Sequence, residues 1–86
     1  MKSILKNYID LLTLDKLKTY AQKQNIQLNE FEFEFILKLV KENFDDILIN
    51  DSKYLDLLDK NINHDSYLKI KDLYLYYKNR YKGYLF

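Results

Sequence analysis

Apolar residues recur three and four positions apart along most of this 86-residue chain. That spacing places them on one face of a helix, whereas a half-buried strand would alternate apolar and polar residues. The pattern predicts five helical segments. The first covers about residues 4–12, the second 14–24, the third begins after Asn29, the fourth covers about 51–61, and the fifth runs to about residue 82.

The third segment combines two competing patterns. Residues 30–35 alternate Glu and Phe, which is the period of a strand, but the alternation fails directly afterwards. Glu34, Lys38 and Glu42 follow one another at steps of four, which only a helix brings together. The apolar residues cover about two-thirds of the helical wheel, which is typical of a central helix packed on several sides. We therefore expect a helix whose core residues are Phe31, Phe35, Ile36, Leu39 and Val40.

Capping residues mark several helix ends. Thr13 precedes the second segment, and Asn29 with Glu32 three residues later resembles a capping box before the third. Residues 63–66 offer several caps for the fifth segment, and Gly83 is expected just past its end.

Two connections join these segments. Residues 25–28 are expected to bury Ile26 and Leu28, whereas residues 45–50 are either an irregular connection or a helical end.

Composition supports the helical reading. The chain has no proline and one glycine, so it lacks the residues that normally form tight turns in sheets. Its hydrophobic content of 48% is sufficient for a core. We predict a single all-α domain covering residues 1–86, a compact bundle of about five short helices with the third central and the fifth longest.

Charge is distributed unevenly along the chain. Residues 1–28 carry five Lys and two Asp, residues 29–65 carry ten acids and four Lys, and residues 66–86 carry five basic residues and one Asp. The order is basic, acidic, basic. Either the acidic middle neutralises its neighbours in the folded bundle, or the two ends form one basic face that meets an anionic partner.

Residues with catalytic or metal-binding chemistry are few. Cysteine is absent and His64 is the one histidine, which excludes thiolate sites and the paired histidines of zinc motifs. The acidic residues at 45–51 lack the spacing of a calcium loop, and Asp56 and Asp59 are interpreted as a solvated face. We expect no catalytic residue, cofactor, metal or small-molecule ligand, and no enzyme.

The N-terminal sequence predicts the compartment. Residues 1–12 are amphipathic and lack the continuous apolar run of a signal peptide. No apolar stretch approaches the ~20 residues that span a bilayer. We expect a cytoplasmic protein without a membrane partner.

A resemblance to a known family rests on scattered, mostly apolar positions. They are Leu12, Thr13, Leu17, Tyr20, Ala21, Ile26, Gln27, Leu28, Ile36, Val40, Lys41, Glu42, Asn43, Tyr67, Ile70, Leu73, Tyr74, Tyr77, Lys78, Tyr81 and Lys82. In these positions the chain resembles the DUF2624-like proteins, a small uncharacterised family of low-GC Gram-positive bacteria (Firmicutes). The resemblance covers nearly the whole chain. It implies a helical cytoplasmic protein, and it carries over no activity and no functional residue.

The fifth segment offers the best candidate for binding. Its row of apolar residues at helical spacing is Tyr67, Ile70, Leu73, Tyr74, Tyr77, Tyr81 and Tyr84, flanked by basic residues. The row is interpreted mainly as a core face, with a partner surface and a nucleic-acid surface as alternatives. Further residues lie outside the row or beyond Gly83. We therefore predict a partner-binding surface at Leu68, Leu75, Tyr76, Arg80, Leu85 and Phe86, for a host protein or for weak self-association.

Nucleic acid remains the alternative partner, through the basic N- and C-terminal segments. A helix-turn-helix built from the second and third segments is disfavoured. Its recognition helix would begin with Glu30, Glu32 and Glu34, which phosphates would repel.

Overall fold

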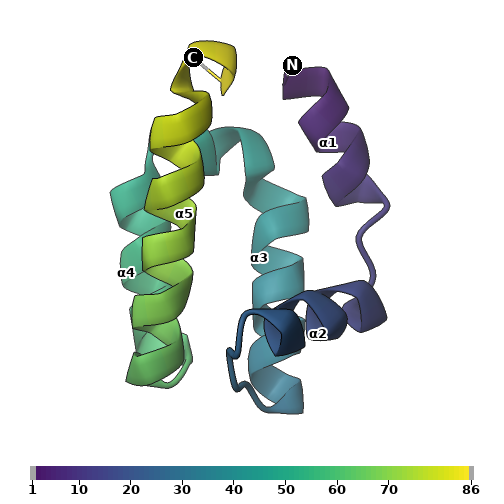
Figure 1. Cartoon of the computed structure of the whole chain (residues 1–86), viewed down its shortest axis with the longest axis vertical. Coiled ribbons are helices and arrows are strands. Elements are labelled where there is room, and N and C mark those ends of the chain that lie inside the picture. The colour runs from purple at the N-terminus through teal and green to yellow at the C-terminus, as the bar shows by residue number, and fades with distance from the viewer. Residues whose placement is uncertain (1, 86) are drawn as a thin grey trace.

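Five helices make up the part of the chain described by the computed structural model, which covers the backbone of residues 2–85 and the side chains of residues 6–80 (Figure 1). They are α1 (Lys2–Asp10), α2 (Leu14–Lys23), α3 (Glu30–Ile49), α4 (Asp51–Asn61) and α5 (His64–Leu85). α1, α2 and α4 all pack against α3, and α5 packs against α4. The prediction of an all-α bundle with a central third helix is confirmed.

The end of α5 differs from expectation. α5 continues through Gly83 to Leu85, so the prediction that Gly83 lies just past the helix is wrong. Glycine favours the position after a helix, but its backbone can also adopt helical angles. α5 has 22 residues, and α3 has 20 and includes a kink at Asn43.

Side-chain caps begin two of the helices as predicted. The Thr13 hydroxyl accepts a hydrogen bond from the Lys16 N–H at 3.2 Å. At the start of α3, the Asn29 side chain accepts from the Glu32 N–H at 2.8 Å, and the Glu32 carboxylate accepts from the Asn29 N–H at 2.9 Å. Both caps are local in sequence, so the residue pattern alone located these helix starts.

Asn25 provides the turn that a glycine would usually make. Its φ of 57° lies in the left-handed region, which asparagine tolerates better than most residues. The Ile26 N–H then donates to the Ala21 carbonyl at 2.8 Å, which satisfies an open carbonyl at the end of α2. The turn directs Ile26 into the core, as the sequence predicted.

α3 bends at Asn43 and continues to Ile49, so residues 45–50 are mainly a helical end. Asn43 has φ −130° and ψ 18°, and its side-chain amide donates to the Leu39 carbonyl at 3.0 Å. A side chain that bonds within the helical ladder in this way is a recognised cause of a kink. The bend turns the end of α3 toward α4, as Figure 1 shows.

The core lies between α3 and the three helices α2, α4 and α5. Its buried hydrophobic residues are Ala21, Ile26, Phe33, Ile36, Leu48, Tyr54, Leu58, Ile62 and Tyr67. The prediction for Ile36 is confirmed, and Phe35, Leu39 and Val40 are half-buried. The prediction for Phe31 is wrong, because this ring is 69% exposed. Phe33, which points to the opposite side of the helix, packs beside Ala21 and Ile26 instead.

Hydrogen bonds join the two connections at the base of the bundle. We call this network the loop clamp and define it as Gln27, Asn29, Glu32, Asn63 and Ser66. The buried Glu32 carboxylate accepts from the Asn63 N–H at 2.6 Å as well as from the Asn29 N–H. The Gln27 carbonyl accepts from the Ser66 hydroxyl at 2.6 Å and from the Asn63 amide at 2.9 Å. The loop clamp therefore fixes the start of α5 against the start of α3.

Within residues 2–85, no helix is both long enough and apolar enough to cross a lipid bilayer.

Candidate functional site

The predicted partner-binding residues of α5 lie on its outer face and on one flank. Tyr76 is 56% exposed, Leu68 is 44% exposed, Arg80 is exposed and Leu75 is half-buried. Arg80 donates to the Tyr76 hydroxyl at 3.2 Å. Leu85 and Phe86 lie outside the residues whose side chains the structure describes.

The tyrosine row divides into a buried and an open part. Tyr67, near the start of α5, is 8% exposed and packs with Ile36, Leu58 and Ile62. Tyr77, ten residues further along the same row, is 43% exposed. The core interpretation therefore holds for the first turns of α5, whereas Tyr77 reaches the surface. Tyr81 and Tyr84 lie outside the described side chains.

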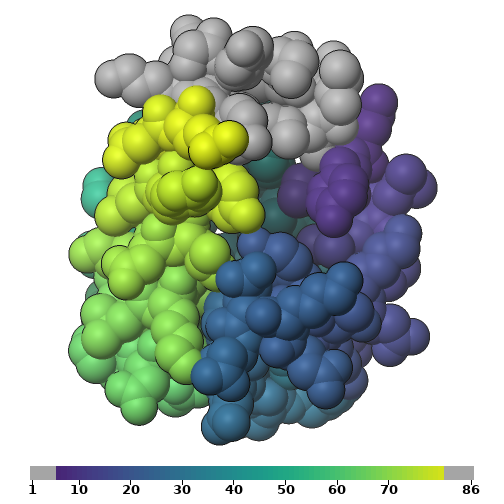
Figure 2. Space-filling model, viewed as in Figure 1, coloured from purple at the N-terminus to yellow at the C-terminus, as the bar shows by residue number. Residues whose placement is uncertain are grey.

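An apolar groove of about 240 Å³ lies between α2 and α5. Its lining residues are Leu17, Tyr20, Ala21, Ile26, Leu28, Ile36, Ile70, Leu73, Tyr74 and Tyr77. In Figure 2 the surface is hollowed between α5 on one side and α1 and α2 on the other. We call this feature the α2–α5 groove.

Tyrosines of α2 and α5 line the α2–α5 groove, and Tyr8 of α1 lies near enough to Tyr20 to affect its pKa. The pKa of Tyr20 is raised, chiefly by burial of its hydroxyl, and further by a side-chain hydrogen bond with Tyr77 and by the charges of Tyr77 and Tyr8. Tyr8 is exposed on α1, and Tyr20 on α2 is 42% exposed. Tyrosine pairs an apolar ring with a polar tip, which suits a surface that is alternately wet and covered.

Basic residues flank the α2–α5 groove on both sides. Lys16 and Lys23 lie four residues before and three residues after Tyr20, which makes them its neighbours on α2. On α5, Arg80 lies three residues after Tyr77, and Lys69 lies four residues before Leu73. No acidic residue occupies a corresponding described position beside Tyr20 or Tyr77. One basic residue or more from each end of the chain therefore neighbours a lining residue of this groove.

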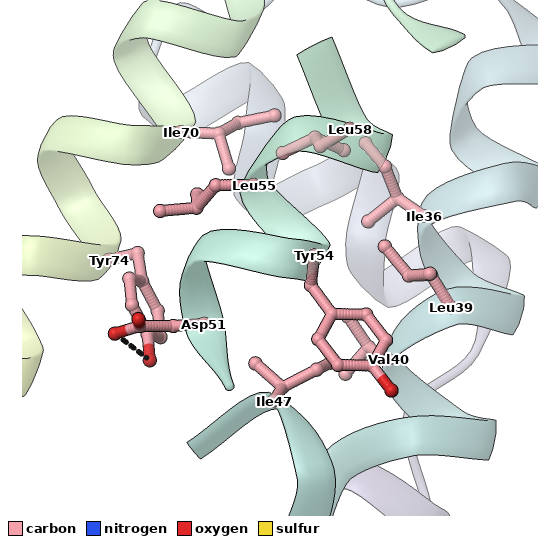
Figure 3. A pocket seen from close by; sticks show the side chains of 10 residues that line it. All are labelled: Ile36, Leu39, Val40, Ile47, Asp51, Tyr54, Leu55, Leu58, Ile70 and Tyr74. Carbon is pink, nitrogen blue, oxygen red and sulfur yellow. Dashed lines mark hydrogen bonds between the residues drawn. The ribbon is translucent and has the colours of Figure 1, made fainter. Parts of the chain in front are cut away.

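The other flank of α5 encloses a smaller apolar cavity. It has a volume of about 110 Å³ and lies between α3, α4 and α5 (Figure 3). Its lining residues are Ile36, Leu39, Val40, Ile47, Asp51, Tyr54, Leu55, Leu58, Ile70 and Tyr74. Figure 3 shows Asp51 and Tyr74 meeting at the side of α5, whereas Tyr54 extends toward Ile47 and Val40.

Polar groups connect α4 and α5 beside this cavity. The Asp51 carboxylate forms an ion pair with Lys78 and accepts a hydrogen bond from the Tyr74 hydroxyl at 3.3 Å. Lys78 holds the pKa of Asp51 below its ordinary value, mainly through its hydrogen bond, while burial opposes the change. Burial, followed by the charge of Asp51, raises the pKa of Tyr74 to about 12. The tyrosine therefore stays protonated, and the contact links the two helices.

The remaining residues that could act in catalysis or bind a metal have structural partners. His64 lies 3.3 Å from Asp59 and stacks on Tyr67 at the start of α5. Asp46 accepts hydrogen bonds from Tyr54 and Asn50, which hold the pKa of Asp46 below its ordinary value. Within the described residues, no three His, Cys, Asp or Glu side chains form a group that could hold a metal ion.

The rim tyrosines are the feature that sequence reasoning missed. Tyr77 belongs to a row interpreted mainly as a core face, and nothing in the spacing of Tyr8, Tyr20 and Tyr77 places them together. One signal was present: tyrosine stands at positions where a fully buried face would favour leucine or isoleucine.

Comparisons with protein-family models, with curated proteins and with solved structures gave no match for this chain. The resemblance to the DUF2624-like proteins therefore stays a prediction. The candidate site stands on its own geometry: an apolar floor, a rim of tyrosines and basic flanks between α2 and α5.

Proposed function

We propose that this chain is a small cytoplasmic interaction or accessory protein that uses α5 to contact a host protein or, weakly, a second copy of itself. The observation that carries the proposal is the exposure of large apolar side chains on α5. Leu68 and Tyr76 are exposed on its outer face, and Tyr77 is exposed at the α2–α5 groove.

The residue types on α5 support a protein partner. Tyrosine and arginine are enriched in protein interfaces, where they account for much of the binding energy. Tyr76 and Arg80 are in direct contact, and Tyr76 also packs edge-on against Tyr77 with 5.2 Å between ring centres. A few such side chains contribute about 1.5–3 kcal/mol each when buried, before the cost of association. This magnitude favours a weak or moderate complex.

The proposal of a binding role and not a catalytic one rests on the residues present. The sequence has a single histidine and no cysteine. Its hydroxyl-bearing Ser and Thr residues therefore have one histidine among them as a candidate activating base.

An affinity capture from the native host tests the use of α5. The wild-type chain would be compared with a Leu68→Ser/Tyr76→Ser variant, using Phe31→Ser as the matched control because Phe31 is also an exposed aromatic ring. We expect the α5 variant to capture at least tenfold less partner protein than wild type. The control should capture as much as wild type. Equal recovery by all three proteins would contradict the proposal.

Nucleic acid is the alternative partner. The helices of the basic N- and C-terminal segments, α1, α2 and α5, lie around one face (Figure 1), which supports this alternative. We expect weak, salt-sensitive retention on a heparin column, because the net charge of the chain is only +1. Sub-micromolar binding to a defined DNA or RNA at physiological salt, measured by fluorescence anisotropy, would favour the alternative.

A further inference from the structure

The α2–α5 groove has the dimensions of a site for a few side chains. Its volume of about 240 Å³ falls below the ~300–1,000 Å³ of pockets that hold drug-sized molecules. The floor is mostly aliphatic, formed by residues such as Leu17, Ala21 and Leu73. Nucleic-acid bases are usually held on aromatic platforms, so an aliphatic floor favours the apolar side chains of a protein.

The α5 wall of the groove has the form of a helix-packing stripe. Ile70, Leu73, Tyr74 and Tyr77 stand at i, i+3, i+4 and i+7, which extends over about 10 Å of helix. A partner helix meets such a stripe with apolar residues at the same spacing. The half-exposed rings of Tyr20 and Tyr77 would be covered in this arrangement.

Charge then determines the kind of helix. By helical spacing, Lys16 and Lys23 stand beside Tyr20 on α2, and Arg80 and Lys69 stand beside Tyr77 and Leu73 on α5. The ammonium groups of Lys16 and Lys69 donate to the Leu11 and Asn25 carbonyls and keep their positive charge. Flanks of one sign favour a partner of the opposite sign and repel one of the same sign. A basic helix, or a lipid surface of positive charge, is therefore disfavoured.

We infer that the α2–α5 groove binds an acidic amphipathic helix of a partner protein. The inference rests on the proposed function of α5 in protein binding and specifies the face of α5 and the chemistry of its occupant. Apolar residues of the partner would occupy the groove between Leu17 and Leu73, and its carboxylates would lie over the basic flanks.

Peptide binding to the isotope-labelled full chain tests the inference directly. The probe is a synthetic helical peptide of about 18 residues, with leucine at i, i+3 and i+7 and glutamate at most other positions. We expect amide shifts in two-dimensional NMR spectra to concentrate at residues 16–23 and 69–77. The same peptide with lysine in place of glutamate, and a scrambled glutamate peptide, should each bind at least tenfold more weakly.

Variants of the rim provide a second measurement. The Tyr20→Ala/Tyr77→Ala variant should bind the glutamate peptide at least tenfold more weakly than wild type. The affinities of the Phe31→Ala and Leu68→Ser variants for this peptide should stay within twofold of the wild-type value. Circular dichroism and thermal unfolding would verify that each variant is folded. The NMR map uses the wild-type chain, so the inference stays testable if a variant does not fold.

Several outcomes would overturn the inference. They are shifts confined to the outer face around Leu68, equal binding of the glutamate and lysine peptides, preferential binding of single-stranded DNA, or a dimer that the rim substitutions dissociate. Loss of host partner by the Leu68→Ser/Tyr76→Ser variant together with no peptide binding in the groove would leave the proposed function intact and reject the acidic helix. Failure of both experiments would reject both.

Discussion

The two ends of the tyrosine row on α5 contrast in what surrounds them. At the base, Tyr67 is buried next to the loop clamp, where buried polar groups such as Glu32 and Ser66 have hydrogen-bond partners. Toward the other end, Tyr77 is half-exposed at the rim of the α2–α5 groove. Satisfied polar contacts fix the start of α5 in place, whereas the Tyr77 ring is partly in water. The same residue type is therefore buried in the core at one end of the row and half-exposed further along it.

The largest expected effect separates these two tyrosines directly. Tyr67→Ala should lower the free energy of unfolding by about 3–5 kcal/mol, because it leaves a cavity in the core. Tyr77→Ala should lower it by about 1–1.5 kcal/mol, because roughly half of the ring is already in water. Urea unfolding followed by circular dichroism measures both. Equal losses for the two variants would show that the row is a uniform core face.

The next effect concerns the loop clamp. Glu32→Ala removes the acceptor for the Asn29 and Asn63 N–H groups and should cost about 3 kcal/mol or more. Glu34→Ala is the matched control, since Glu34 is exposed two residues away on α3, and it should change stability by about 0.5 kcal/mol or less. Chemical unfolding of both variants tests this. If the two substitutions cost the same, the loop clamp does not fix α5.

The smallest effect lies on the flank of α5 that faces α4. The folded-state pKa of Asp51 is lowered from its ordinary value of 3.8 by Lys78. Its stabilising contribution is therefore complete above about pH 5 and is lost as the pH falls through the lowered folded-state pKa. Asp51→Asn should cost about 0.5–1 kcal/mol at pH 7, and the difference from wild type should shrink below pH 4.

Asp56→Asn is the control for this measurement, because Asp56 is exposed on the same helix. Its stability should match that of wild type within about 0.5 kcal/mol at each pH. A difference between wild type and Asp51→Asn that stays constant from pH 7 to pH 3 would mean that the contact with Lys78 does not contribute through the charge of Asp51.

The number and type of the helices, and several of their starts, follow from the order of residues along the chain. Apolar spacing requires no knowledge of neighbouring elements, and the caps at Thr13 and Asn29 act over three residues. The central place of α3 followed from the breadth of its apolar surface. The scarcity of glycine and proline pointed to helices joined by polar turns, and Asn25 supplies such a turn.

Which apolar residues are covered depends on how the helices pack. Phe31 and Phe33 belong to the same alternating run, yet α2 packs against Phe33 and leaves Phe31 in water. The kink at Asn43 depends on a side-chain bond that spacing does not reveal. The α2–α5 groove likewise arises because α5 packs closely on α4 and leaves space toward α2. Burial is a property of how helices approach one another, so a one-dimensional pattern identifies candidate faces and the packing of the helices selects among them.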